Sequence, residues 1–123
     1  MELTDFRSDL LAGRVCVVSG FGTGLGRAIG MALASVGATV VGCGRRPGPL
    51  AATVDIIRGA GGRAEAESVD IRDEDGVERF FESMLERHGR VDVLVNNAGG
   101  QFFGPAEDVN PKGLRTIVEL NLI

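Results

Sequence analysis

Residues 14–34 (RVCVVSGFGTGLGRAIGMALA) constrain the fold more than any other stretch of the chain. Apolar residues 15–18 lead into a glycine turn, residues 20–26, and apolar side chains at helical spacing follow it. A strand, a glycine turn and a helix in this order aim backbone N–H groups and a helix N-terminus at an anion such as a phosphate. The same turn would also serve as a plain strand-to-helix connection that binds nothing.

The spacing of the glycines is more informative than their number. The general dinucleotide fingerprint G-x-G-x-x-G is not met, because Leu25 or Arg27 falls in its third glycine position. The chain instead has Ser19-Gly20-x-x-x-Gly24-x-Gly26. This resembles the T-G-x-x-x-G-x-G form of the short-chain dehydrogenase/reductase family, with serine in place of threonine. The resemblance implies that the following residues help to bind a dinucleotide: Ser19, Gly20, Gly22, Gly24, Leu25 and Gly26.

Length and composition predict one α/β domain in a reducing compartment. The chain has 123 residues, 44% of them hydrophobic and 24% charged, and a net charge of −4, which gives no general affinity for nucleic acid or anionic membranes. No apolar run approaches the roughly 20 residues of a membrane span, and three acids among the first ten residues are unlike a signal peptide. Cys16 and Cys43 lie in apolar runs, so we expect buried free thiols and a cytoplasmic protein.

Strand and helix patterns alternate along the whole sequence. We expect strands at residues 15–18, 38–43, 63–69 and 91–95, and helices ending near residue 37, at 50–58, between 73 and 89, and from 110 onward. This alternation predicts a parallel sheet with right-handed crossovers and strand order 3-2-1-4, the first half of a Rossmann-type doubly wound sheet. Residues 1–123 would form one incomplete dinucleotide-binding domain behind a lead-in whose apolar residues cover one end of the sheet.

Two arginines follow the second predicted strand. NAD-binding folds place an acid about 20 residues past the glycines, to accept from the ribose 2′-hydroxyl, whereas this chain has Arg45 and Arg46 there. Guanidinium groups bind phosphate bidentately, so this arginine turn predicts NADP(H). A solvated basic turn is the alternative. Many NADP-preferring relatives also carry Lys or Arg just before the middle glycine, where this chain has Thr23.

Two further turns follow the third and fourth predicted strands. Asp70 and Ile71 close the third, and we expect Asp70 beside the adenine, although it would equally form a simple turn. Asn96-Asn97-Ala98-Gly99 follows the fourth strand, and its small residues let the chain pass close to a cofactor. This second motif strengthens the family resemblance, which implies that Asn97, Ala98 and Gly99 face the cofactor while the Asn amides hold the fourth strand to its neighbours.

Asn121 lies on the apolar stripe of the last predicted helix, with Leu114, Ile117, Val118 and Leu122. A buried amide is costly unless it is hydrogen-bonded, so we expect Asn121 to serve bonding and not packing. The family resemblance implies a catalytic role, because an Asn of this helix joins a Ser-Tyr-Lys group there and orders a proton-conducting water chain. A satisfied core asparagine is the alternative.

The rest of that catalytic group is missing from the sequence. The chain has no Tyr, and its single lysine, Lys112, stands at a predicted helix start, so the family's Tyr-x-x-x-Lys motif is expected beyond Ile123. The fourth strand would also form an open sheet edge without further strands. We therefore interpret the sequence as the N-terminal half of a longer enzyme, expected to be a homo-oligomer when complete.

The resemblance implies hydride transfer between NADP(H) and a carbonyl, an alcohol or an activated C=C bond of a small molecule. Phe102 and Phe103 suit an apolar substrate, and their loop looks like that of enoyl-CoA and dienoyl-CoA reductases, which act on acyl thioesters. A 3-oxoacyl thioester or a simple alcohol fits as well, and packing of the loop itself is the alternative role for the two phenylalanines. No metal ligands are assigned. A non-catalytic NADP-binding module and an association-prone, inactive fragment remain the alternatives.

Overall fold

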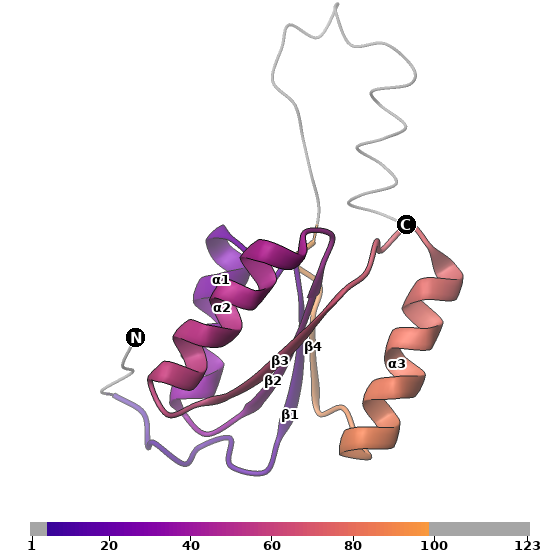
Figure 1. The fold of residues 1–123 in the computed structure, drawn as a ribbon. Coiled ribbons are helices and arrows are strands. Elements are labelled where there is room, and N and C mark those ends of the chain that lie inside the picture. Colours follow the sequence, from indigo (N-terminus) through magenta and orange to yellow (C-terminus); the bar gives the residue numbers. More distant parts are fainter. Residues whose placement is uncertain (1–4, 99–123) are drawn as a thin grey trace, which may run out of the picture.

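The computed structural model describes residues 5–98, and they form a parallel sheet flanked by helices (Figure 1). The elements in chain order are β1 (Val15–Ser19), α1 (Gly24–Ser35), β2 (Thr39–Gly44), α2 (Pro47–Gly59), β3 (Arg63–Ser68), α3 (Glu74–His88) and β4 (Val93–Val95). The strand order is β3-β2-β1-β4, so the predicted α/β class and the 3-2-1-4 order are confirmed. The expectations for Gly99, the phenylalanine loop and Asn121 lie outside the described residues.

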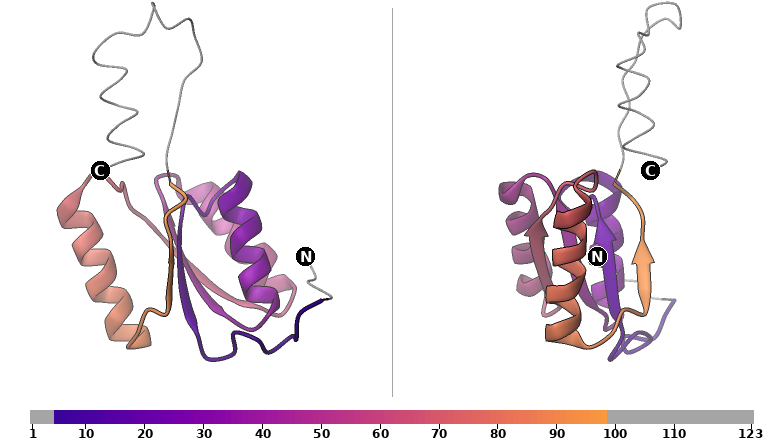
Figure 2. Two further views of the ribbon diagram at one scale, coloured as in Figure 1. Left: turned by 180° about the vertical axis from the view of Figure 1, so that it is seen from behind. Right: turned by 90° about the vertical axis from the view of Figure 1, so that its right-hand side faces the viewer.

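The described part has three layers, with α1 and α2 on one face of the sheet and α3 on the other (Figures 1 and 2). All five residues of β1 are buried, and so are the four central residues of β2. Parallel strands covered on both faces need such continuous apolar runs. The sheet therefore takes its middle from the two most apolar segments of the chain.

Phe21 fills the space between the sheet and α1, and its side chain is fully buried. Its ring lies between Gly42 of β2 and Gly30 of α1. A Cβ atom at Gly42 would lie 2.1 Å from Phe21 Cδ2, and one at Gly30 would lie 2.4 Å from Phe21 Cε1. Both glycines are therefore required by packing, because each provides room for one side of the same aromatic ring.

The helix α3 covers the opposite face of the sheet. Phe80 and Met84 pack against the buried side chains of β1 and β2, and Phe80 meets Phe81 edge to face at 5.2 Å between ring centroids. The predicted helix ends are confirmed, because Asp73 caps the first turn through the Gly76 N–H and Gly89 ends the helix in a left-handed conformation.

The last turn of α3 is attached to β3 by polar contacts. Glu65 Oε1 lies 2.7 Å from His88 Nε2 and accepts a hydrogen bond of 2.8 Å from Arg87 Nη2. Arg87 Nη1 also lies 3.5 Å from Glu67. Alternation in β3 explains this arrangement, since Glu65 and Glu67 share one face of the strand. His88 thus has a carboxylate partner.

The structure differs from the sequence expectations at several element limits and in the lead-in. Helix α2 begins at Pro47 instead of residue 50, because proline is well suited to a first helical turn. Strand β4 begins at Val93, and Asp92 before it instead accepts a 2.8 Å hydrogen bond from the Val15 N–H. In the lead-in, Leu11 packs on the core, whereas Phe6 and Leu10 are exposed.

Both cysteines are buried and free, as predicted. Burial, together with the nearby charge of Glu67, raises the pKa of the Cys43 thiol to about 11. Burial likewise raises the pKa of Cys16. Both side chains therefore stay protonated at neutral pH and act as small apolar groups. Among the helices of residues 5–98, none is long and apolar enough to cross a membrane.

We predict that Gly42→Ala destabilises the protein by about 2 kcal/mol or more, because the new methyl group overpacks the Phe21 ring. Denaturant unfolding measures the change in the free energy of unfolding. Gly48→Ala is the matched control, since no atom of the described residues lies within 4 Å of its added Cβ and Gly48 is in the first turn of α2. Equal stabilities of the two variants would contradict the packing argument.

Candidate functional site

A cavity of about 610 Å³ lies at the carboxyl ends of the strands. Its walls come from the glycine turn, the arginine turn, the end of β3 and the turn after β4. Ten of the residues predicted to bind a cofactor line it together: Gly20, Gly22, Gly24, Leu25, Arg45, Arg46, Asp70, Ile71, Asn97 and Ala98. Ser19 and Gly26 lie behind this lining.

The glycine turn owes its shape to backbone conformations and close contacts. Gly20 and Gly24 have φ values of +64° and +55°, which residues other than glycine rarely adopt. A Cβ atom at Gly26 would lie 1.9 Å from the carbonyl oxygen of Gly20, so only glycine fits there. Helix α1 begins at Gly24, and the first amides of a helix have no intrahelical acceptor. The turn thus presents N–H donors and a positive helix end to the cavity.

Ser19 joins the glycine turn to the turn after β4. Its Oγ accepts hydrogen bonds from the backbone N–H groups of Asn97 (2.9 Å) and Ala98 (2.8 Å), and it lies 3.3 Å from the Val95 carbonyl, to which it donates. The Asn97 side chain also donates to the Gly20 carbonyl at 3.4 Å. Asn97 therefore holds the fourth strand to its neighbour, as expected from the sequence. Ser19 does so from behind the cavity.

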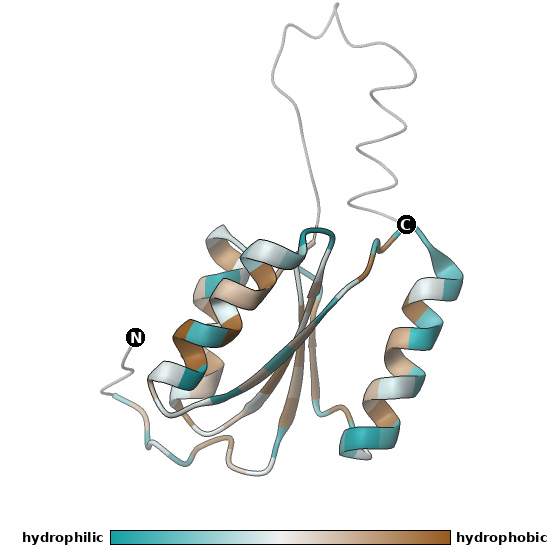
Figure 3. Ribbon diagram, viewed as in Figure 1, coloured by the Kyte–Doolittle hydropathy of each residue, from teal (hydrophilic) through white to brown (hydrophobic). Residues whose placement is uncertain are grey.

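The arginine turn lies at the cavity and is strongly hydrophilic, as the teal turn between β2 and α2 in Figure 3 shows. Arg45 and Arg46 are both exposed, and Arg46 is the N-cap residue of α2. The Ser68 hydroxyl donates to the Arg45 carbonyl at 2.8 Å, which fixes the turn to the end of β3. Two cations are thus placed on the same side of the cavity as the N-terminus of α2.

Asp70 forms the turn considered for it in the sequence and also lies at the cavity. It forms a turn, because its carboxylate accepts from the backbone and side chain of Arg72, and it also lines the cavity. The hydrogen bond from the Arg72 side chain holds the pKa of Asp70 below its ordinary value, and the charge of Arg45 adds a smaller effect. Asp70 is therefore a carboxylate at neutral pH, able to accept from an amine in the cavity.

Sequence reasoning missed Arg27 and Thr53, which link the glycine turn to α2. Arg27 Nε donates to Thr53 Oγ1 at 2.8 Å, and Arg27 Nη2 donates to the Gly22 carbonyl at 2.8 Å. A signal for Arg27 was available, because it is the only charged residue between Arg14 and Arg45. The sequence around Thr53 offers no such signal. A threonine beside the apolar residues of a helix does not reveal which distant group it will bond to.

The strand order, the crossovers and the cavity at the carboxyl ends of the strands define a Rossmann-type domain. A family model described as short chain dehydrogenase matches residues 14–123. The chain belongs to this family, and the resemblance inferred from the glycine spacing is confirmed.

Relatives and solved structures agree with this assignment. The chain is 32% identical to a peroxisomal 2,4-dienoyl-CoA reductase of Arabidopsis thaliana, over 96% of the chain and 40% of the reductase. It matches a citronellol catabolism dehydrogenase of Pseudomonas aeruginosa at TM-score 0.90 and 36% identity, over 95% of this chain and 48% of that one. A metagenomic short-chain oxidoreductase in complex with NADP matches at TM-score 0.84 and 42% identity, over 91% and 51%. The chain thus spans about half or less of their lengths.

We predict that Ser19→Ala costs about 1–3 kcal/mol of unfolding free energy, because two backbone N–H groups lose their buried acceptor. Hydrogen exchange should become faster at the Asn97 and Ala98 amides in particular. Ser19→Thr keeps the oxygen and should stay close to the parent protein.

Ser35→Ala is the matched control, because the Ser35 hydroxyl bonds only within its own helix, to the Ala32 carbonyl. Its effect should stay within about 0.5 kcal/mol. If Ser19→Ala left exchange at Asn97 and Ala98 unchanged, the proposed linking role of Ser19 would be wrong.

Proposed function

We propose that this chain is the cofactor-binding half of an NADP(H)-dependent oxidoreductase that transfers hydride to or from a small molecule. The observation that carries the proposal is the pair Arg45 and Arg46, exposed at a cavity that the glycine turn also lines. Membership of the short chain dehydrogenase family and the likeness to an oxidoreductase in complex with NADP support it.

The residues of the cavity fit a dinucleotide with an additional phosphate. Within residues 5–98, nothing lies within 4 Å of a Cβ placed on Gly24, so the space beside this first residue of α1 is open. We assign the pyrophosphate to the glycine turn and the 2′-phosphate to Arg45 and Arg46, whose guanidinium forks match phosphate oxygens. The adenine would lie beside Asp70 and Ile71, and the nicotinamide ribose near Asn97, Ala98 and Gly99.

A bound nicotinamide ring would donate or accept the hydride, and the protein would supply binding, orientation and a path for the proton. We propose that Asn121 takes part in ordering the proton path and that a Tyr-x-x-x-Lys motif elsewhere in the whole protein supplies the acid. The substrate class is a small carbonyl, alcohol or enoyl compound. The likeness to a 2,4-dienoyl-CoA reductase favours an acyl thioester.

The alternative of an association-prone fragment rests on a different observation. Val93 and Leu94 of the edge strand β4 are 36% and 49% exposed within the described residues. An apolar edge of this kind would suit a fragment that associates with other chains, or a domain whose sheet continues in the whole protein. The second interpretation agrees with the proposed N-terminal half and with a homo-oligomer of the whole protein. A non-catalytic NADP-binding module would share the same cavity.

We predict that Arg45→Asp and Arg46→Asp, in the whole protein, each weaken NADPH binding about tenfold or more while leaving NADH binding within about threefold. A charge-assisted hydrogen bond to phosphate contributes about 1.5–3 kcal/mol, and tenfold corresponds to about 1.4 kcal/mol. Equilibrium titration with both reduced cofactors measures the two dissociation constants.

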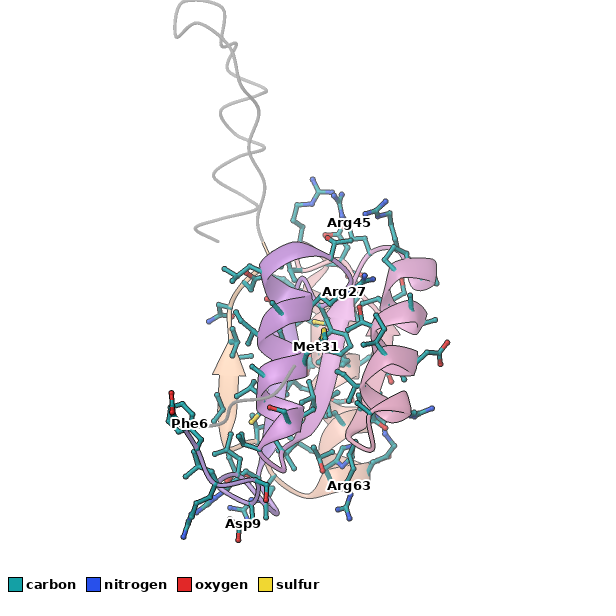
Figure 4. The ribbon with its side chains drawn as sticks, turned by 90° about the vertical axis from the view of Figure 1, so that its left-hand side faces the viewer. Phe6, Asp9, Arg27, Met31, Arg45 and Arg63 are labelled. Atoms are coloured by element: carbon teal, nitrogen blue, oxygen red, sulfur yellow. The ribbon has the colours of Figure 1, made fainter. Side chains whose placement is uncertain are left out.

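Arg63→Asp is the control with the same change of charge, because Arg63 lies at the opposite end of the molecule from Arg45 (Figure 4). It should leave the preference for NADPH unchanged. Equal affinities of the parent protein for NADPH and NADH would show that the arginine turn is merely solvated.

A further inference from the structure

We propose that Arg27 and Thr53 are positioning residues that hold the glycine turn and the arginine turn at a fixed separation. Two phosphate groups of one ligand would then meet both turns at once. The inference rests on the proposed NADP(H) function. It assigns part of the preference for NADPH over NADH to residues outside the arginine turn.

Arg27 projects from the first turns of α1 toward α2 (Figure 4). Its guanidinium donates to three acceptors: Thr53 Oγ1 at 2.8 Å, the Gly22 carbonyl at 2.8 Å and the Pro49 carbonyl at 3.4 Å. One acceptor belongs to the glycine turn and two belong to α2. The guanidinium therefore bridges the two elements directly.

Thr53 makes the same bridge from the other side. It is fully buried, and its Oγ1 lies 3.0 Å from the Pro49 carbonyl and 3.3 Å from the Gly22 carbonyl. The two segments also pack closely, because a Cβ atom at Gly22 would lie 3.0 Å from Pro49 Cβ and 3.4 Å from the backbone nitrogen of Leu50. The glycine turn is thus held against the first turn of α2 by packing and by a closed set of hydrogen bonds.

This link reaches the arginine turn through the start of α2. The helix begins at Pro47, and Arg46 is its N-cap residue. The Leu50 N–H also donates to the Arg46 carbonyl at 3.4 Å. Fixing Pro49 to Gly22 therefore fixes Arg46 relative to the glycine turn.

The charge of Arg27 is used for this link and not for an ion pair. None of the ion pairs within residues 5–98 includes Arg27. A planar guanidinium presents several N–H donors in a fixed plane, whereas a lysine ammonium is a point charge on a flexible stem. Lysine would therefore keep the charge at this position and lose the geometry.

The consequence is a selective effect on ligands that span both turns. A ligand that is bound at one turn reaches the other turn at a high effective concentration only when the protein already holds the two turns at the right separation. NADPH has phosphates for both turns, NADH has none for the arginine turn, and adenosine 2′-monophosphate reaches the arginine turn alone. Loosening the link should thus affect NADPH most.

The test measures dissociation constants of these three ligands for the whole protein and its variants. We expect Thr53→Val to lower the preference for NADPH over NADH about fivefold or more, while the affinity for adenosine 2′-monophosphate stays within twofold. Arg27→Lys should behave like Thr53→Val. Thr53→Ser should restore the parent values, because it keeps the hydroxyl.

Other outcomes overturn the inference. An unchanged preference in both Thr53→Val and Arg27→Lys, even with lower thermal stability, would leave the pair a merely structural role. If Arg27→Lys kept the parent preference for NADPH, the positive charge alone would matter and not the guanidinium geometry. The same conclusion would follow if Arg27→Met weakened the binding of NADPH and of adenosine 2′-monophosphate equally. A parent protein without preference for NADPH would instead overturn the proposed function, and the inference with it.

Discussion

The contact between Gly26 and the carbonyl oxygen of Gly20 is the constraint on which the rest of the site depends. With no side chain at residue 26, the start of α1 can lie directly against the end of β1. Any Cβ atom there would meet that oxygen at 1.9 Å and move the helix away from the sheet. Ser19 and Arg27 flank this compact turn on either side. Ser19 bonds to the turn after β4, and Arg27 bonds to α2. Both sets of bonds would lose their geometry if the compact turn opened.

The fold could be predicted largely from local patterns in the sequence. The apolar runs of β1 and β2 and the cap residues Asp73 and Gly89 carry their meaning within a few residues of the chain. One error came where a tertiary contact decides an element's limit. Asp92 faces the Val15 N–H and not the core, so the last strand begins later than its apolar pattern suggests.

The candidate site was predictable where it is made of backbone. The glycine turn and the small residues after β4 follow from spacing, and the arginine turn follows from its distance to the glycines. The links between these parts were not predictable. Arg27 meets Thr53, and His88 meets Glu65, across separations of 26 and 23 residues. No periodic pattern indicates which distant polar groups will pair, because the pairing depends on how the helices pack on the sheet.

Phe21 shows how one large side chain can restrict sequence elsewhere. Its ring lies against two glycines that belong to different elements, Gly30 in α1 and Gly42 in β2. A methyl group at either position is compatible with the fold only if the aromatic ring becomes smaller. Positions 21, 30 and 42 are therefore coupled and can change only as a set, although the chain places them in a turn, a helix and a strand. In a lineage of such chains, a leucine or valine at position 21 would come before an alanine at 30 or 42.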